Sequence, residues 1–268
     1  TSTQNYTQMK IKVMTFNIRY RLAKDGMNNW EYRKPLVIER IRAFGPNLIG
    51  MQECRDDAQA AFIQAALPDY HFFGVRRGGA DETKLEMAPI LIRKDAFEIE
   101  EQGVFWLSET PEVAGSKSWQ TTFARTVTWA RIRAKGGGKR FLFLNTHFDY
   151  ITEAILGSAR FLARWVEEAQ QAYPVILTGD FNADKDSSAY QILTKNLRDA
   201  YRAVNPHPKD ETSLHGYGNL GNRTSIDWVL VSENFSVQAA QIDRTKVGER
   251  YPSDHYPVTV TLSESGRK

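Results

Sequence analysis

The stretch VILTGDFN, residues 175–182, joins a short apolar run to a cluster of polar side chains. Its first four residues, Val175 to Thr178, have the aliphatic and β-branched character of a buried strand. The next four, Gly179 to Asn182, place a carboxylate and an amide where that strand ends. A rigid strand can hold such groups open to solvent, so this stretch predicts a site residue, Asp180, at a strand end.

The same arrangement recurs along the chain. Polar groups stand beside predicted strands at five places, namely Asn17; Gln52 and Glu53; Asn145, Thr146 and His147; Asp180 and Asn182; and Ser253, Asp254 and His255. Taken alone, each has an ordinary explanation, such as a turn that Asp180 and Asn182 cap or a structural histidine at position 147. Five strand ends with acid, amide or imidazole groups favour one shared site instead.

Periodicity predicts the surrounding elements. Apolar runs rich in β-branched and aromatic residues predict strands at 11–18, 48–51, 89–92, 126–132, 141–146, 175–178, 228–231, 237–242 and 258–262. Helical spacing predicts helices at 33–44, 56–67 and 152–172. We expect Thr152 to cap the last of these helices, and Gly45-Pro46 to stop the first.

Strand order and composition predict an α/β fold in a single domain. Two predicted strands flank Gly136 to Gly138, which indicates a hairpin and disfavours a purely parallel sheet. The pattern fits largely antiparallel sheets with helices packed outside. Because the composition shows no break, we expect one domain over residues 10–263, with a polar tail at 1–9 and a short tail at 264–268.

Bulk properties exclude some classes of protein. With 268 residues, 41% of them hydrophobic, the chain can bury a large core, and extensive disorder is excluded. No apolar run reaches about eighteen residues, so no membrane span is predicted. The single cysteine, Cys54, cannot form an intramolecular disulfide. The compartment stays open: cytoplasmic, or exported if a leader was removed.

The charge balance is mildly basic. A net charge of +3 is compatible with phosphorylated substrates but is a weak sign of nucleic-acid binding. The densest basic stretch comprises Arg131, Arg133, Lys135, Lys139 and Arg140. We interpret it as a solvated hairpin in preference to a surface that contacts phosphates.

The candidate residues suit a hard cation and phosphoryl chemistry. Magnesium prefers carboxylate and carbonyl oxygens, which Glu53, Asp254 and Asn17 offer, and manganese is a suitable substitute. Phosphoryl transfer also needs an activated water and neutralisation of charge on the phosphoryl oxygens. Asp180 and the two histidines, His147 and His255, could supply these functions.

Six motifs together resemble the endonuclease/exonuclease/phosphatase superfamily. They run from about Met14 to Leu262 in the order Thr15-Phe16-Asn17, Met51-Gln52-Glu53, Asn145-Thr146-His147, Gly179-Asp180-Phe181-Asn182, Ser225-Ile226-Asp227-Trp228 and Ser253-Asp254-His255. The resemblance is closer to a bacterial branch, marked by Asn29-Trp30 with Arg33, Glu86 before Pro89-Ile90, Phe105-Trp106-Leu107-Ser108, Arg125 with Trp129-Ala130-Arg131, and His215-Gly216. It implies a four-layered α/β sandwich, with two mostly antiparallel sheets face to face and helices outside.

The resemblance also implies a role for each residue. By this resemblance, Glu53 binds the cation, with Asn17 and Asp254 close by. Asp180 orients or deprotonates the attacking water, and Asn182 helps to hold it. His147 and His255 bind the scissile phosphate, Asp227 orients His255, and the substrate is contacted by Arg125, Glu86 and Asn145. One departure concerns an arginine that relatives often carry after the histidine motif. Residues 153–156 read EAIL here, so this stretch offers no arginine for such a contact.

The expected activity is metal-dependent hydrolysis of a phosphorylated small molecule or headgroup, as a phosphodiesterase or phosphatase. A nuclease acting on DNA or RNA is the alternative, because the same site serves many substrates. A non-catalytic module that binds phosphate or carbohydrate is a further alternative, supported by Trp30, Trp106 and Trp119 as aromatics that look exposed. No protein partner is predicted.

Overall fold

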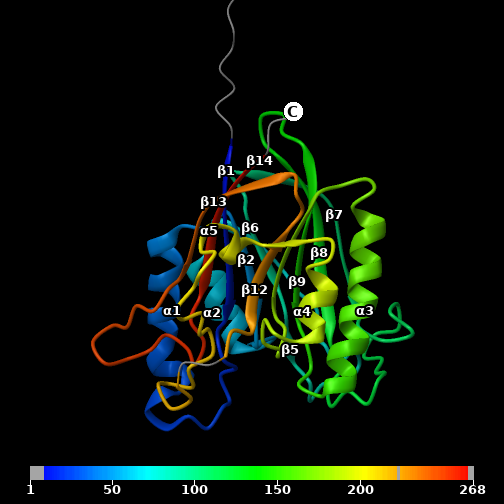
Figure 1. The fold of residues 1–268 in the computed structure, drawn as a ribbon. Helices are drawn as coiled ribbons and strands as arrows, with labels where there is room; N and C mark the ends of the chain where they lie inside the picture. Colours follow the sequence, from blue (N-terminus) through cyan, green and yellow to red (C-terminus); the bar gives the residue numbers. More distant parts are fainter. Residues whose placement is uncertain (1–8, 222–223, 265–268) are drawn as a thin grey trace, which may run out of the picture.

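The computed structural model describes residues 9–221 and 224–264 and shows two large sheets packed face to face. Helices cover the outer side of each sheet (Figure 1), so the predicted four-layered α/β sandwich is confirmed. The predicted tails at 1–9 and 264–268 fall mostly outside the described residues, apart from Met9 and Glu264. No helix in the described ranges is long and apolar enough to cross a membrane.

Each large sheet contains six of the described strands. The first sheet has the spatial order β13 (Phe235–Ile242), β14 (Val258–Glu264), β1 (Lys10–Asn17), β2 (Leu48–Gln52), β6 (Ile90–Arg93) and β4 (Tyr70–Phe73). The second has the order β11 (Arg198–Asp199), β12 (Asp227–Val231), β10 (Val175–Asp180), β9 (Arg140–His147), β8 (Thr126–Ala134) and β7 (Phe97–Trp106). A small third sheet pairs β3 (Cys54–Arg55) with β5 (Glu86–Met87).

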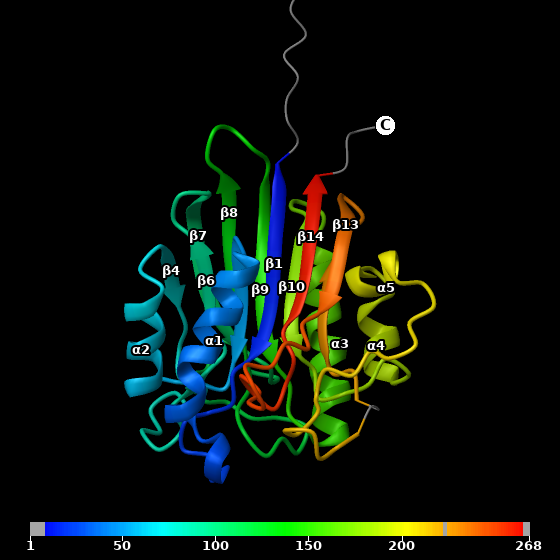
Figure 2. The same cartoon turned by 90° about the vertical axis from the view of Figure 1, so that its left-hand side faces the viewer.

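Helices form the two outer layers. Figure 2 shows α1 (Trp30–Phe44) and α2 (Ala58–Ala66) over the first sheet, with a 3₁₀ turn, η1 (Gly26–Asn28), before α1. The second sheet is covered by α3 (Thr152–Ala169) and α4 (Ser188–Leu193), whereas α5 (Ala200–Val204) contacts β12 and β13. Gly45 ends α1 with a left-handed backbone (φ 65°), which confirms the predicted stop.

Alternation along the inner strands creates three apolar layers. In β9, Phe141 and Phe143 enter the core between the two sheets, whereas Leu142 and Leu144 face the helices α3 and α4. Because both faces of β9 are covered, the strand reads as an unbroken apolar run, as its sequence showed. Each fully buried Phe or Leu of this kind contributes roughly 1.5–3 kcal/mol to folding.

The start of α3 differs from the prediction. Ile151, not Thr152, is the residue that caps the helix, and no side chain bonds to the free amides from that position. Instead the Asp149 carboxylate accepts a hydrogen bond from the Ile151 amide at 3.1 Å. This bond fixes the turn that leads into α3, and Thr152 is the first residue of the helix rather than its cap. The helix also ends at Ala169, three residues before the predicted end.

The basic stretch pairs with an edge strand that the sequence did not predict. On β7, Glu98 pairs with Arg133, and Glu100 accepts hydrogen bonds from Arg131 and Arg140. The predicted hairpin joins β8 to β9 and lies at the opposite end of β9 from His147. These arginines are therefore occupied at the sheet surface, in agreement with the solvated-hairpin interpretation.

Candidate active site

The two parallel strand pairs decide where the site forms. β1 and β2 run parallel, as do β9 and β10, so four strands deliver their carboxyl ends to one edge of the sandwich. There Asp180 is in register with His147 on β9 and with Asp227 on the antiparallel strand β12. The segment before β14, which pairs with β1, brings Asp254 and His255 to the same edge.

Asp180 is the centre of the site and is almost fully buried. One carboxylate oxygen, Oδ2, accepts a hydrogen bond from the Asn17 amide at 2.9 Å and lies 3.3 Å from Nε2 of His147. Nε2 of His255 is 3.8 Å from the same oxygen. Burial opposes ionisation, but the two imidazoles and the Asn17 amide outweigh it and lower the pKa of Asp180.

Glu53 follows β2 with an unusual left-handed backbone (φ 59°). Its carboxylate accepts a hydrogen bond from the Asn17 amide at 2.6 Å, so Asn17 connects Glu53 to Asp180. Burial and the nearby Asp254 carboxylate raise the pKa of Glu53. Ligand atoms of Glu53, His147 and Asp180 lie within 4.8 Å of one another, which is close enough to surround one cation.

His255 and Asp227 form a buried pair. Nδ1 of His255 lies 2.8 Å from Oδ2 of Asp227, and Ser213 holds Asp227 in place by accepting a hydrogen bond from its amide. Burial disfavours the charged imidazolium, but the Asp227 and Asp254 carboxylates outweigh it and raise the pKa of His255 well above its usual value. His255 therefore presents a cationic Nε2 toward Asp180.

Arg19, which the sequence did not single out, lies beside the acidic residues. Its guanidinium contacts Asp25 at 2.9 Å and lies 3.9 Å from Glu53 and 3.8 Å from Asp254. The hydrogen bonds that Arg19 donates to Asp25, together with the neighbouring carboxylates, raise the pKa of Arg19, so the guanidinium stays charged. Ser253 fixes the other side of this region, since its hydroxyl donates to the carbonyl of Asn17 at 2.7 Å.

Asn145, one of the residues predicted to contact the substrate, is held inside the protein. The side chain of Asn145 donates to the carbonyls of Met51 and Pro89 and accepts hydrogen bonds from Gln52 and Thr178. It is fully buried between the sheets, away from the surface.

Asn182 is half-buried and lies close to Asp180. Its amide N–H donates to Asp180 at 3.1 Å, and its side chain donates to the carbonyl of Phe148 at 2.7 Å. These bonds fix the turn that follows β10, and they leave the side-chain oxygen of Asn182 as the group able to face a ligand.

Arg125 and Glu86 line a narrow cavity together with His147 and Arg77. Arg77 donates to the Glu86 carboxylate at 2.6 Å, and Arg125 donates to Asp149 at 3.3 Å. Glu86 belongs to β5 and is therefore positioned by its pairing with β3, which follows Glu53 in the chain. The sequence identified Arg125 and Glu86 but missed Arg77, because an arginine in a loop carries no periodic signal.

The three tryptophans proposed as a binding platform are not exposed together on the surface. Trp30 and Trp106 are 2% and 5% exposed, so they belong to the core. Trp119 is half-buried and packs against the second sheet's helical layer. The structure thus removes the main support for a carbohydrate-binding module.

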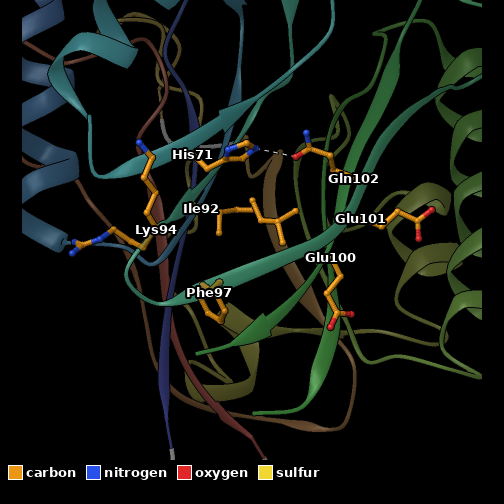
Figure 3. Close-up of a pocket in the computed structure, with 9 residues that line it drawn as sticks. His71, Ile92, Lys94, Phe97, Glu100, Glu101 and Gln102 are labelled. Carbon is orange, nitrogen blue, oxygen red and sulfur yellow. Dashed lines mark hydrogen bonds between the residues drawn. The ribbon is translucent and has the colours of Figure 1, made fainter. Parts of the chain in front are cut away.

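A separate hollow lies at the sheet edges (Figure 3). It is lined by residues of β4, β6 and β7 and the segment between β6 and β7, and Nε2 of His71 on β4 lies 2.9 Å from the side-chain oxygen of Gln102 on β7. None of the candidate catalytic residues lines it. His71 contacts an amide rather than an acid or a nucleophile. The glutamates of the hollow, Glu100 and Glu101, pair with Arg131, so they do not form a catalytic pair with His71.

Comparison with known proteins identifies the family. The sequence profile of the Endonuclease/Exonuclease/phosphatase family matches residues 14–255, so the chain belongs to that family. It is therefore an enzyme of the phosphoesterase class, in which phosphatases and nucleases both occur.

Three solved structures illustrate the similarity. An endonuclease/exonuclease/phosphatase from Bacteroides vulgatus is 33% identical with a TM-score of 0.88, over 96% of this chain and all of that one. A mannosyl-6-phosphatase from Bacteroides thetaiotaomicron is 32% identical with a TM-score of 0.84, over 94% and 99% of the two chains. D. rerio TDP2 bound to a single-stranded DNA product is 16% identical with a TM-score of 0.75, over 96% and 100%. This last likeness concerns the fold alone.

Proposed function

We propose that this protein hydrolyses phosphate monoesters of small molecules, with sugar phosphates as the substrate class, and that it uses a divalent cation. The observation that carries the proposal is the convergence of Asp180, His147, His255 and Glu53 at one edge of the sandwich. An ionised carboxylate between two imidazoles suits attack by water on phosphorus.

In the proposed mechanism, Asp180 orients the attacking water. Its lowered pKa keeps the carboxylate ionised, and the Asn17 amide holds one of its oxygens in place. The water proton passes to Asp180 as the bond from the water oxygen to phosphorus forms and the bond from phosphorus to the ester oxygen breaks. The departing oxygen takes up a proton from solvent, and the products are the alcohol and inorganic phosphate. His255, cationic because of Asp227, and His147 donate hydrogen bonds to the phosphoryl oxygens and stabilise the charge that develops there.

The residues present fit a magnesium or manganese ion. Glu53 and Asp254 offer hard oxygen ligands, whereas the side-chain oxygen of Asn17, predicted as a third ligand, accepts a hydrogen bond from the Arg19 amide at 3.0 Å. Burial and the Asp254 charge raise the pKa of Glu53, and a cation bound there would offset both effects. When bound, the ion supplies charge neutralisation for the phosphoryl group. We propose Glu53 as its main ligand.

The substrate class rests on similarity and charge. The mannosyl-6-phosphatase is 32% identical over nearly the whole chain, which favours a phosphorylated sugar. The basic residues of β8 and β9 are paired with glutamates of β7, so that face offers little free positive charge for a nucleic-acid backbone. A nuclease remains the second candidate, because TDP2 with bound DNA shares the fold.

The test is a substrate panel run with magnesium, with manganese and with EDTA. It contains mannose 6-phosphate, p-nitrophenyl phosphate, bis(p-nitrophenyl) phosphate and single-stranded DNA. We expect metal-dependent release of phosphate from the sugar ester, lowered roughly 10²- to 10⁴-fold by Asp180→Asn. Exposed Glu167→Gln on α3 is the matched control. Preferential cleavage of DNA, or full activity of the Asp180 variant, contradicts the proposal.

A further inference from the structure

Two arginines share the narrow cavity beside His147. Arg77 lies in the segment after β4, Arg125 immediately precedes β8, and His147 ends β9. Both arginines are more than nine-tenths buried, at 9% and 5% exposed. Most buried polar side-chain atoms have a hydrogen-bond partner, so donors of these arginines that lack one are informative about the cavity.

The bonding of these arginines is incomplete. Arg77 donates through Nη2 to Glu86, and Arg125 donates through Nε to Asp149. Nε of Arg77 and Nη1 of Arg125 are buried, and among the described residues they have no hydrogen-bond partner. A buried guanidinium N–H without an acceptor is unfavourable, so each of these atoms favours an acceptor from outside the protein.

Phe123 and the carboxylates keep the two guanidiniums in place. The centre of the Phe123 ring lies 4.4 Å from Arg77 and 5.4 Å from Arg125. The Phe123 amide donates to Asp149 at 3.0 Å, which ties the ring to the partner of Arg125. Burial and the charge of Arg125 lower the pKa of Arg77. The two cations therefore repel each other, and an anion beside them would relieve that repulsion.

We propose that Arg77 and Arg125 donate hydrogen bonds to the terminal oxygens of the substrate phosphate and thereby select phosphomonoesters over phosphodiesters. A monoester presents two negative charges and no second organic group. A diester carries a single charge and places its second ester group against the narrow cavity. This inference rests on the proposed function, because it assigns a specificity role within the same site.

Phosphate binding tests the inference without turnover. Calorimetry with inorganic phosphate and magnesium is run on the wild-type protein, Arg77→Gln, Arg77→Lys and the control Arg76→Gln. Arg76 pairs with Asp56 at 2.7 Å and does not line the cavity. We expect binding roughly 10- to 100-fold weaker in Arg77→Gln, because one charge-assisted hydrogen bond is lost. Arg77→Lys, which keeps the charge, should be intermediate, and Arg76→Gln unchanged.

Substrate selectivity gives the second readout. The ratio of kcat/KM for p-nitrophenyl phosphate to that for bis(p-nitrophenyl) phosphate should fall at least about 10-fold in Arg77→Gln, while diester cleavage persists. If kcat/KM falls equally for both substrates and phosphate binding is unchanged, Arg77 has a structural role and the inference is overturned. If Arg77→Gln does not fold, Arg77→Lys carries the test, and an unchanged ratio together with unchanged phosphate binding overturns it.

The two proposals fail in different ways. If the wild-type protein hydrolyses none of the esters but binds phosphate through Arg77, the proposed function is wrong, whereas phosphate binding by the two arginines is supported. If it hydrolyses monoesters while Arg77→Gln binds phosphate normally and keeps its selectivity, the proposed function is supported and the role inferred for the two arginines is wrong.

Discussion

Two neighbouring carboxylates of the site, the buried Asp180 and the half-buried Glu53, have pKa values shifted in opposite directions. The pKa of Asp180 is lowered because two imidazoles and an amide surround it, despite burial. The pKa of Glu53 is raised because burial acts together with the Asp254 carboxylate. Environment, rather than residue type, therefore separates an ionised group that orients water from a group suited to a cation.

At the scale of single residues, we predict that Glu53→Gln abolishes stabilisation by metal. In the wild-type protein, magnesium at about 100 times its dissociation constant should add about 2.7 kcal/mol to the free energy of unfolding. Loss of the ligand charge should remove most of this gain. Thermal unfolding with and without magnesium measures it, with Glu167→Gln as the control. A full magnesium effect in Glu53→Gln would exclude Glu53 as the main ligand.

At the scale of elements, the helix α3 has a glycine in its interior because Trp119 packs closely against it. Trp119 and Gln120 both have left-handed backbones (φ 54° and 61°), which are costly for residues other than glycine. They place the indole against Gly157 in the interior of α3, where a Cβ atom would lie 2.2 Å from the Trp119 ring. The glycine is therefore retained despite its low helix propensity.

We predict that Gly157→Ala destabilises the protein, although alanine favours helices. The added methyl group must displace Trp119, at a cost of about 1–3 kcal/mol, typical of overpacking. In a Trp119→Ala background the same change should instead stabilise α3 by up to about 1 kcal/mol. Urea unfolding of the four proteins measures the difference. The same sign in both backgrounds would contradict the close contact.

An ion cluster connects the turn after β10 to α5, and we predict that it makes stability depend on pH. Glu211 pairs with Arg202 at 2.7 Å and with Lys185 at 3.0 Å. Burial acts against ionisation, but these partners outweigh it and lower the pKa of Glu211. The stabilisation is present above the pKa of the unfolded chain, about 4.3, and is lost as pH falls through the lower folded value.

The measurement for this prediction is urea unfolding of wild type and Glu211→Gln from pH 3 to pH 7. The variant should be less stable at pH 6–7, and the gap should close below about pH 4. Glu167→Gln serves as the control for removal of an exposed acid. A gap that stays constant over the whole range would show that the charge of Glu211 is not responsible.

At the scale of the whole molecule, Asn145 joins the two sheets. It lies on β9, yet it donates to carbonyls of Met51 and Pro89, which belong to the first sheet and its neighbouring segment. Gly50 makes room for it, because a Cβ at that position would lie 2.5 Å from the Asn145 side-chain oxygen. These hydrogen bonds join the sheet whose strand β2 precedes Glu53 to the sheet that carries His147 and Asp180.

We predict that Asn145→Ala lowers the free energy of unfolding by at least about 2 kcal/mol, because buried donors and acceptors lose their partners. Exposed Asn219→Ala should have little effect. Denaturant unfolding measures stability, and KM is determined in parallel. Unchanged stability with a raised KM would instead support a direct contact between Asn145 and the substrate.

Much of the fold was predictable because its inner strands are strongly apolar. The helices at 33–44 and 56–67 correspond to α1 and α2, and all nine predicted strands are present with shifts of a few residues or fewer. The strand β7 was missed because its Glu98, Glu100 and Glu101 obscure the alternation, and α4 and α5 are too short for periodicity to reveal.

The sequence by itself determined the family, the layered fold and the acid, amide and imidazole groups at the strand ends, because strand periodicity and local motifs are properties of adjacent residues. Only the tertiary structure decided which of these groups meet. It placed Arg19 and Arg77 among them, turned Asn145 into the space between the sheets and set opposite pKa shifts for Asp180 and Glu53. Contacts between residues far apart in the chain depend on how the sheets pack, and short segments of sequence do not encode that packing.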